Sequence, residues 1–217
     1  MRTDLTTEQI EAYRRDGCLL YKDFLTAKEL KTLSDAVDRA VEEMGTKKIT
    51  DAGATHMPEE KTEDYYTRVF LQRLNLYRID DDVRDIMLRP ALGGMLCLLE
   101  GIDGIRVWHD QTLQKMPWGN PTSWHMDCPN WSFHHRNAIS IWIALDDATI
   151  QNGSMYYLPG SHKVARWEKK GGFSPNVGAM FEEYPELRSV EPVPAVMKAG
   201  DAGFHNGLTA HGAGPNM

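Results

Sequence analysis

The sequence predicts an α+β fold in which helices come first and antiparallel strands form a mainly β core. Two observations predict it. Apolar residues recur at three- and four-residue steps over the N-terminal part, and short strand patterns separated by turn signals follow from Ile105 onward. Because helices and strands that are segregated along a chain pack as separate layers, we expect a sandwich or barrel supported by N-terminal helices. The 217 residues fit a single domain, 1–217.

The N-terminal third is expected to contain two capped helices. Thr6 and Thr26 each stand three residues before a Gln or a Glu, which is the capping-box spacing that starts a helix. Gly17 can end the first helix, and residues 18–21 are a short strand candidate. The second helix is predicted from one apolar stripe, which consists of Leu30, Leu33, Ala36, Val37, Ala40, Val41 and Met44.

Three segments connect these helices to the β-rich half. Residues 46–64 are polar and lack periodicity, which favours a loop or lid. Two more helical zones are expected, at about 65–76 and 82–99. The most apolar stretch, 86–102, is interrupted by two charges and a proline and is too short to span a bilayer, so we interpret it as a buried helix.

One strand of the second half has a clear pattern of alternation. Over residues 138–145, large aliphatic side chains alternate with small residues around a single tryptophan. Alternate residues of a strand point to opposite faces, so one face is expected to be packed and the other to leave room for a ligand. The first face consists of Ile139, Ile141, Ile143 and Leu145, and the second of Ala138, Ser140, Trp142 and Ala144.

Charge and cysteine content narrow the class of partner and the compartment. The chain has 24 basic and 31 acidic residues, for a net charge of −7, and no dense Lys/Arg tract. This argues against nucleic acid, and we expect a small-molecule substrate and no membrane partner. Cys18, Cys97 and Cys128 are widely spaced without a CxxC pair, and the N-terminus lacks a secretory signal pattern, so we expect reduced thiols and a cytoplasmic protein. The oligomeric state stays open.

Three residues form a candidate metal site. His125 and Asp127 are two residues apart, so on a strand both side chains would point to the same face, and His211 supplies a second imidazole after a turn and a predicted strand. Two histidines and one carboxylate leave three adjacent positions of an octahedron open, which suits non-heme Fe(II) and O₂. Taken alone, the first two could equally form a surface ion pair, and His211 could be a hydrogen-bonded core residue.

Several motifs in a fixed order make the sequence resemble the phytanoyl-CoA dioxygenase family. The opening, residues 5–26, is similar to that family's N-terminal helix, strand and helix. The resemblance implies a double-stranded β-helix (jelly-roll, cupin-like) core that uses Fe(II), 2-oxoglutarate and O₂. The implied reaction hydroxylates an unactivated C–H bond of a small molecule, with release of succinate and CO₂. The motifs are Lys115–Gly119, Trp124–Asp127, Ile139–Asp147, Asn152–Gly153, Leu158–His162, Gly200–Asp201 and His211–Asn216.

The resemblance also implies roles for individual residues. His125, Asp127 and His211 would be the catalytic iron ligands. Trp142 matches a position that lies against 2-oxoglutarate in the family, and Gln111 falls on a strand position whose side chain contacts the same co-substrate in relatives. His205 is expected to pack or bond near the site and not to bind the metal. Ala213 occupies a place where some relatives have a serine that bonds 2-oxoglutarate.

One family feature lies outside the sequence, and two other functions stay open. In the family, an arginine about ten residues beyond the distal histidine grips the far carboxylate of 2-oxoglutarate. The sequence ends at Met217, six residues after His211, so we expect the natural chain to continue with this arginine and the last strand. The alternatives are a non-catalytic metal-binding jelly-roll module and a cupin-type metalloenzyme that does not use 2-oxoglutarate.

Overall fold

The computed structural model of the chain describes residues 1–44, 65, 68–168 and 174–217. The expected loop at 46–64 lies outside these residues. The helices are α1 (Thr7–Asp16), α2 (Ala27–Met44), α4 (Asp81–Met87), α5 (Pro90–Glu100) and α6 (Met180–Glu183). The strands are β1 (Cys18–Tyr21), β2 (Leu71–Leu74), β3 (Gln111–Gln114), β4 (Thr122–His125), β5 (Ile139–Ile143), β6 (Met155–Tyr157), β7 (Val193–Pro194), β8 (Ala202–Asn206) and β9 (His211–Ala213).

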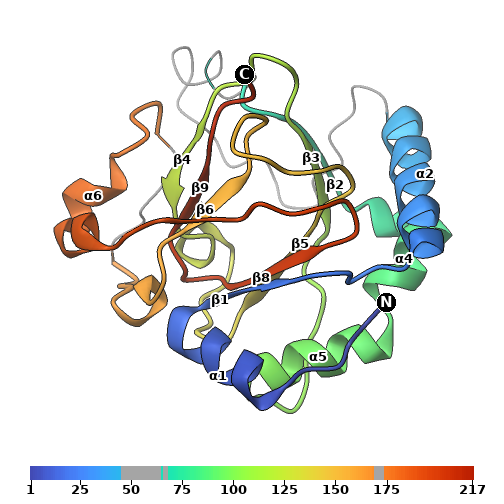
Figure 1. Cartoon of the computed structure of the whole chain (residues 1–217), viewed down its shortest axis with the longest axis horizontal. Coiled ribbons are helices and arrows are strands. Elements are labelled where there is room, and N and C mark those ends of the chain that lie inside the picture. The colour runs from blue at the N-terminus through green and yellow to red at the C-terminus, as the bar shows by residue number, and fades with distance from the viewer. Residues whose placement is uncertain (45–64, 66–67, 169–173) are drawn as a thin grey trace.

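The strands form antiparallel sheets that enclose the centre of the molecule (Figure 1). One sheet has the order β1-β8-β5, a second has the order β4-β9-β6-β7, and β2 pairs with β3. Neighbours in these sheets are far apart in the sequence, as in the pairing of β1 with β8 and of β4 with β9. The N-terminal helices lie along the outside, α1 and α5 below the first sheet in the view of Figure 1 and α2 to its right.

The alternation in β5 divides its side chains between two environments as expected. Ile139, Ile141 and Ile143 pack against the core cluster that the helices form with Phe204. Trp142 lies on the opposite face, packed against a smaller cluster around Tyr157. The aliphatic face therefore packs, half-buried, against the helical layer, and the face with small residues points between the two sheets.

Local signals explain where the first two helices begin and end. Thr6 caps α1 in a complete capping box, and Gly17 ends the helix in the left-handed conformation, with φ 76°. At the start of α2 the Glu29 backbone N–H donates to Thr26 Oγ1, and a Glu29 carboxylate oxygen accepts from the Thr26 backbone N–H. The apolar stripe of α2 is buried where the spacing predicts it, at residues such as Leu33 and Ala40.

The predicted helical zone at 65–76 is wrong over its second half. Residues 71–74 form strand β2, and a 3₁₀ turn follows at Leu76–Arg78. Leu, Gln and Arg favour helices locally, but β3 pairs with this segment about 40 residues later in the chain and satisfies its backbone hydrogen bonds. Tertiary pairing therefore overrides local propensity here.

The predicted helix at 82–99 is instead two helices, α4 and α5. The break falls just before Pro90, where Arg89 is extended, with φ −63° and ψ 124°. Proline has no N–H to donate and restricts the preceding residue to extended conformations, so Pro90 starts a new helix. None of the described helices combines the length and apolar composition that crossing a membrane requires.

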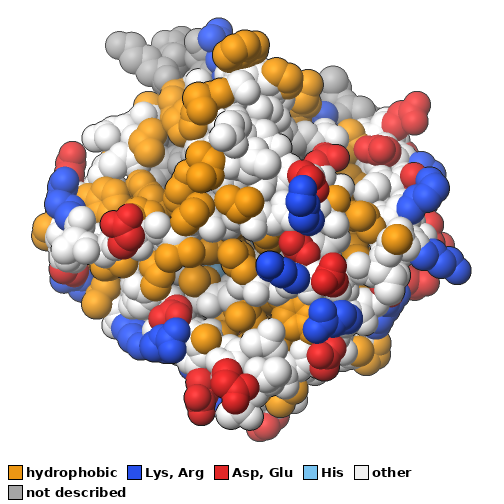
Figure 2. Space-filling model, viewed as in Figure 1, with side chains coloured by type: hydrophobic (Ala, Val, Ile, Leu, Met, Phe, Trp, Pro, Cys, Tyr) orange, Lys and Arg blue, Asp and Glu red, His pale blue; other side chains and the backbone are white. Residues whose placement is uncertain are grey.

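The outer surface has two kinds of area in the view of Figure 2. Basic and acidic side chains are interspersed over its lower and right parts, and apolar side chains gather over β4, β6 and β9. An apolar hollow on this second area is lined by Trp124, Tyr156, Val177 and Pro192, among others.

Two adjacent leucines of α5 allow a direct measurement of how much the helical layer stabilises the fold. Leu99 is fully buried, whereas Leu98 is 55% exposed. We predict that Leu99→Ala lowers the free energy of unfolding by about 2–5 kcal/mol, because it leaves a cavity in the core. Leu98→Ala, as the matched control, should change it by less than about 0.5 kcal/mol. Urea denaturation measures both, and equal effects would contradict the packing described here.

Candidate metal centre

Two strands place the histidines of the predicted triad side by side. His125 is the last residue of β4, His211 is the first of β9, and the two are register partners. Asp127 lies beyond the end of β4 in a helical conformation, with φ −69° and ψ −56°, so the prediction that it shares the strand with His125 is wrong. Its carboxylate nevertheless reaches the histidines, and one potential ligand atom from each residue lies within 4.8 Å of the others.

The backbone orients both imidazoles toward a common space. His125 Nδ1 is 2.8 Å from the Ser123 carbonyl oxygen, and His211 Nδ1 is 2.9 Å from the Thr209 carbonyl oxygen. Since a carbonyl can only accept, each Nδ1 carries the proton and donates, which leaves each Nε2 with a lone pair for a metal.

The distances to the carboxylate agree with this orientation. His125 Nε2 and His211 Nε2 lie 3.6 and 3.7 Å from Asp127 Oδ1, beyond the usual length of a direct hydrogen bond. The three atoms therefore surround a gap.

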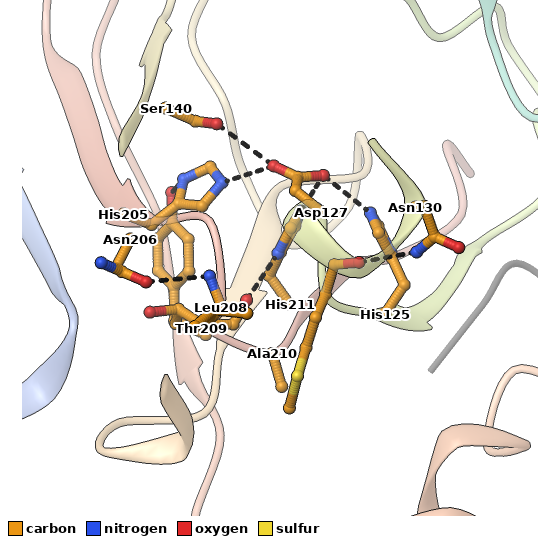
Figure 3. Close-up of polar contacts among 12 residues, drawn as sticks. His125, Asp127, Asn130, Ser140, His205, Asn206, Leu208, Thr209, Ala210 and His211 are labelled. Atoms are coloured by element: carbon orange, nitrogen blue, oxygen red, sulfur yellow. Dashed lines mark hydrogen bonds and ion pairs between the residues drawn. The ribbon is translucent and has the colours of Figure 1, made fainter. Parts of the chain in front are cut away.

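The other carboxylate oxygen of Asp127 faces the opposite sheet. Ser140 Oγ donates to Asp127 Oδ2 at 3.2 Å, and His205 Nε2 lies 3.3 Å from the same oxygen. Figure 3 shows the carboxylate between His205 on one side and His125 and His211 on the other. His205 thus bonds to a member of the triad, as the sequence predicts.

Burial and neighbouring charges shift the pKa values of Asp127 and His211. Burial alone would raise the pKa of Asp127, but His211, His125 and His205 together hold this pKa well below its usual range. Burial and the nearby His125 lower the pKa of His211 to about 3, against the opposing effect of Asp127. An ionised carboxylate and a neutral imidazole are the forms that bind a metal, so the site is ready for a cation at neutral pH.

The residues present fit a ferrous ion. Non-heme Fe(II) oxygenases use two imidazole nitrogens and one carboxylate oxygen on one face of the metal, and the gap between Oδ1 and the two Nε2 atoms offers this set. Fixed tautomers and a carboxylate held by further hydrogen bonds are the outer interactions that metal sites require.

The two predicted co-substrate residues occupy different surroundings. Trp142 stands two residues after Ser140, so it shares the face of β5 that carries the hydrogen bond to Asp127. Gln111 begins β3, is exposed, and its Oε1 accepts from Gln72 Nε2 at 2.6 Å across the β2–β3 pair. The structure thus places Trp142 on the inner face and joins Gln111 to Gln72.

Three aromatic side chains that are not adjacent in the sequence form a cluster near Asp127. Trp131 and Phe133, which follow Asp127, contact Trp108 with ring centroids 5.1 and 5.4 Å apart. Trp108 is 40% exposed and Phe133 37%, so the cluster presents apolar surface. Trp108 and His109 come shortly before β3, and the only signal in the sequence was their aromatic character.

The fold and the site together define a class of protein. Antiparallel sheets that wrap around two histidines and one carboxylate, with an alternate strand face directed inward, describe a jelly-roll metalloprotein with a facial triad. Residues 13–217 match the sequence profile of the family described as phytanoyl-CoA dioxygenase (PhyH). The chain belongs to this family.

Individual relatives agree with this assignment. Methylphosphonate hydroxylase of Gimesia maris is 27% identical over 100% of this chain and 77% of its own length. The peroxisomal phytanoyl-CoA dioxygenase of Bos taurus is 25% identical over 98% of this chain and 64% of its own. A similar solved structure is that of SnoK, a non-heme alpha ketoglutarate dependent carbocyclase from nogalamycin biosynthesis. It superposes with a TM-score of 0.80 at 25% identity, and the match covers 98% of this chain and 79% of the SnoK chain. The predicted jelly-roll fold is confirmed.

A close approach between the sheets provides a test of the site's packing. A Cβ atom at Gly203 would lie 2.9 Å from the hydroxyl oxygen of Tyr157, which is buried. We predict that Gly203→Ala destabilises the protein by about 1–3 kcal/mol, because the rigid phenol must move. Gly94→Ala in α5 is the control: nothing lies within 4 Å of its Cβ position, and it should stabilise by up to about 1 kcal/mol. Thermal unfolding measures both, and a neutral Gly203→Ala would contradict the contact.

Proposed function

We propose that this protein is an Fe(II)- and 2-oxoglutarate-dependent dioxygenase that hydroxylates a small organic molecule, with His125, Asp127 and His211 as the metal ligands. The observation that carries this proposal is that each of the three residues offers a ligand atom within 4.8 Å of the other two, with both Nε2 atoms 3.6 and 3.7 Å from Asp127 Oδ1. Membership of the family and the alpha ketoglutarate dependent relative of similar fold support the same chemistry.

The chain's residues would position and shield the reactants. When bound, Fe(II) and 2-oxoglutarate supply the oxidation of a C–H bond by O₂, with release of succinate and CO₂. His125 and His211 would hold the metal through Nε2, and Asp127 would balance its charge. Trp142, on the inner face of β5, is the proposed wall against 2-oxoglutarate, and Gln111, bonded to Gln72, is the proposed contact from β3. With three protein ligands, the site would leave room at the metal for the co-substrate and O₂.

We infer that the substrate docks an apolar part against the rings of Trp108, Trp131 and Phe133. Several observations place these rings near the triad. Trp131 is separated from Asp127 only by the 3₁₀ turn Cys128–Asn130. Its indole also lies close to Gly207, in the connection between β8 and β9.

The residue beside Trp108 supports the same placement. His109, whose ring centroid is 4.2 Å from that of Trp108, has its pKa lowered by burial and partly restored by the charge of Asp127. The three cysteines of the protein are free thiols, which supports our proposal that the enzyme works in a reducing compartment such as the cytoplasm.

Metal binding tests the proposed ligands directly. We predict that His125→Ala weakens binding of Fe(II), titrated without O₂ by calorimetry, by at least about 100-fold, because one of three ligands is lost. His134→Ala is the matched control, since His134 stacks on Trp167, with ring centroids 4.8 Å apart, and belongs to a different contact. Addition of 2-oxoglutarate to the Fe(II) form should produce a visible charge-transfer band. Unchanged Fe(II) affinity in His125→Ala would overturn the assignment.

A second experiment tests the substrate surface separately from the metal. We predict that Trp108→Ala weakens the binding of 2-naphthol, an uncharged aromatic probe, by about tenfold, because an aromatic contact is worth roughly 0.5–1.5 kcal/mol beyond its burial. Fe(II) affinity should stay at the wild-type value. Calorimetry measures both. Tighter binding of methylphosphonate than of 2-naphthol would contradict an apolar substrate and leave the metal assignment intact.

A further inference from the structure

We propose that His205 is a positioning residue for the metal ligand Asp127: it holds Oδ2 so that Oδ1 alone is presented to the metal. This inference rests on the proposed assignment of Asp127 as a ligand. It adds a role for a histidine that belongs to β8 in the opposite sheet and that lies outside the triad.

The direction of the Asp127 carboxylate is not set by strand geometry. Strand β4 ends at His125, and Asp127 is the residue that leads into the 3₁₀ turn. Its orientation must therefore come from side-chain contacts. The donors to Oδ2 are Ser140 at 3.2 Å and His205 at 3.3 Å, which are register partners on β5 and β8. Together they fix the side of the carboxylate that faces away from the histidine pair (Figure 3).

The ring of His205 is itself held by a hydrogen bond on its other nitrogen. An ionised carboxylate can only accept, so the Nε2 of His205 carries the proton, and in the neutral ring Nδ1 is then the acceptor. The hydroxyl of Tyr157 lies 3.4 Å from this Nδ1 and donates to it. Tyr157 is 1% exposed and His205 is 4% exposed, so solvent does not compete for either group. The phenol thereby selects the tautomer of His205 that can donate to Asp127.

The contacts of His205 lead back to the metal site through Tyr157, which belongs to the same sheet as His211. Tyr157 on β6 is the register partner of His211 on β9. A series of contacts therefore connects two proposed ligands across the interior: it runs from His211 through Tyr157 and His205 to Asp127. Gly203 makes the connection possible, since a Cβ there would collide with the phenol oxygen.

The geometry separates this role from that of a fourth ligand. His205 Nε2 is directed at Oδ2, whereas the gap proposed for the metal is bounded by Oδ1 and the Nε2 atoms of His125 and His211. Outer hydrogen bonds of this kind orient the ligand, and their loss typically weakens metal binding by about 10–100-fold.

Cobalt(II) affinity is the experimental readout, measured without O₂ from the visible absorption of the bound ion. His205→Phe retains a ring of similar size and removes both hydrogen bonds, whereas His205→Gln retains a side-chain N–H donor that can reach Oδ2. Tyr157→Phe removes only the hydroxyl. Phe204→Leu is the matched control, because Phe204 is the neighbouring buried residue on β8 and packs on the helical side. X-ray absorption of each cobalt complex counts its oxygen ligands.

We expect His205→Phe to bind cobalt(II) at least tenfold more weakly than wild type and Tyr157→Phe to be weakened less. His205→Gln should recover affinity to within about threefold, and Phe204→Leu should keep wild-type affinity at a lower melting temperature. X-ray absorption should show an added carboxylate oxygen in His205→Phe.

Two results would overturn the proposal: wild-type affinity in His205→Phe, or equal weakening in His205→Gln and Phe204→Leu, which would indicate a merely structural role. If His205→Phe does not fold, Tyr157→Phe and His205→Gln decide. These outcomes differ from failure of the proposed function, in which His125→Ala would bind cobalt(II) as tightly as the wild type.

Discussion

The carboxylate of Asp127, 19% exposed between two sheets, is the constraint on which the arrangement of the site depends. Removing an ionised carboxylate from water costs several kcal/mol unless hydrogen bonds and opposite charge compensate. Each oxygen of Asp127 has its own set of neighbours: Oδ2 faces Ser140 and His205, and Oδ1 faces the histidine pair. Both sheets must therefore close around this residue, and a cation in the gap would complete the compensation.

This requirement explains the composition of the interior. The inward face of the β1-β8-β5 sheet carries Trp142 beside small or polar residues such as Gly203 and Ser140, whereas the outward face is aliphatic and packs against the helical core. Tyr157 fills the space between the sheets and reaches His205. The space around the triad is thus specialised for polar contacts, while a large hydrophobic cluster lies on the helical side of the sheet and two smaller ones flank the site. The two tasks are assigned to opposite faces of the same strands.

Much of the fold could be predicted because its signals are local. The capping box at Thr6, the left-handed Gly17 and the alternation in β5 each depend on residues within a few positions of one another. One prediction that failed depends on a partner elsewhere, because strand β2 owes its form to its pairing with β3. The other had a local signal, since the missing N–H of Pro90 ends a helix within a long apolar period.

The sequence by itself determined the identity of the three proposed ligands, through residue types and motif order that resemble a family, and it determined which face of β5 would be packed. Only the tertiary structure decided how Asp127 is aimed, because His125 lies on a strand and Asp127 does not.

Likewise, only the tertiary structure showed which groups His205 contacts, that Tyr157 holds it, and that Trp108 joins Trp131. The physical reason is that a spacing of two residues specifies side-chain direction only within a regular strand, whereas hydrogen bonds between sheets join residues tens of positions apart.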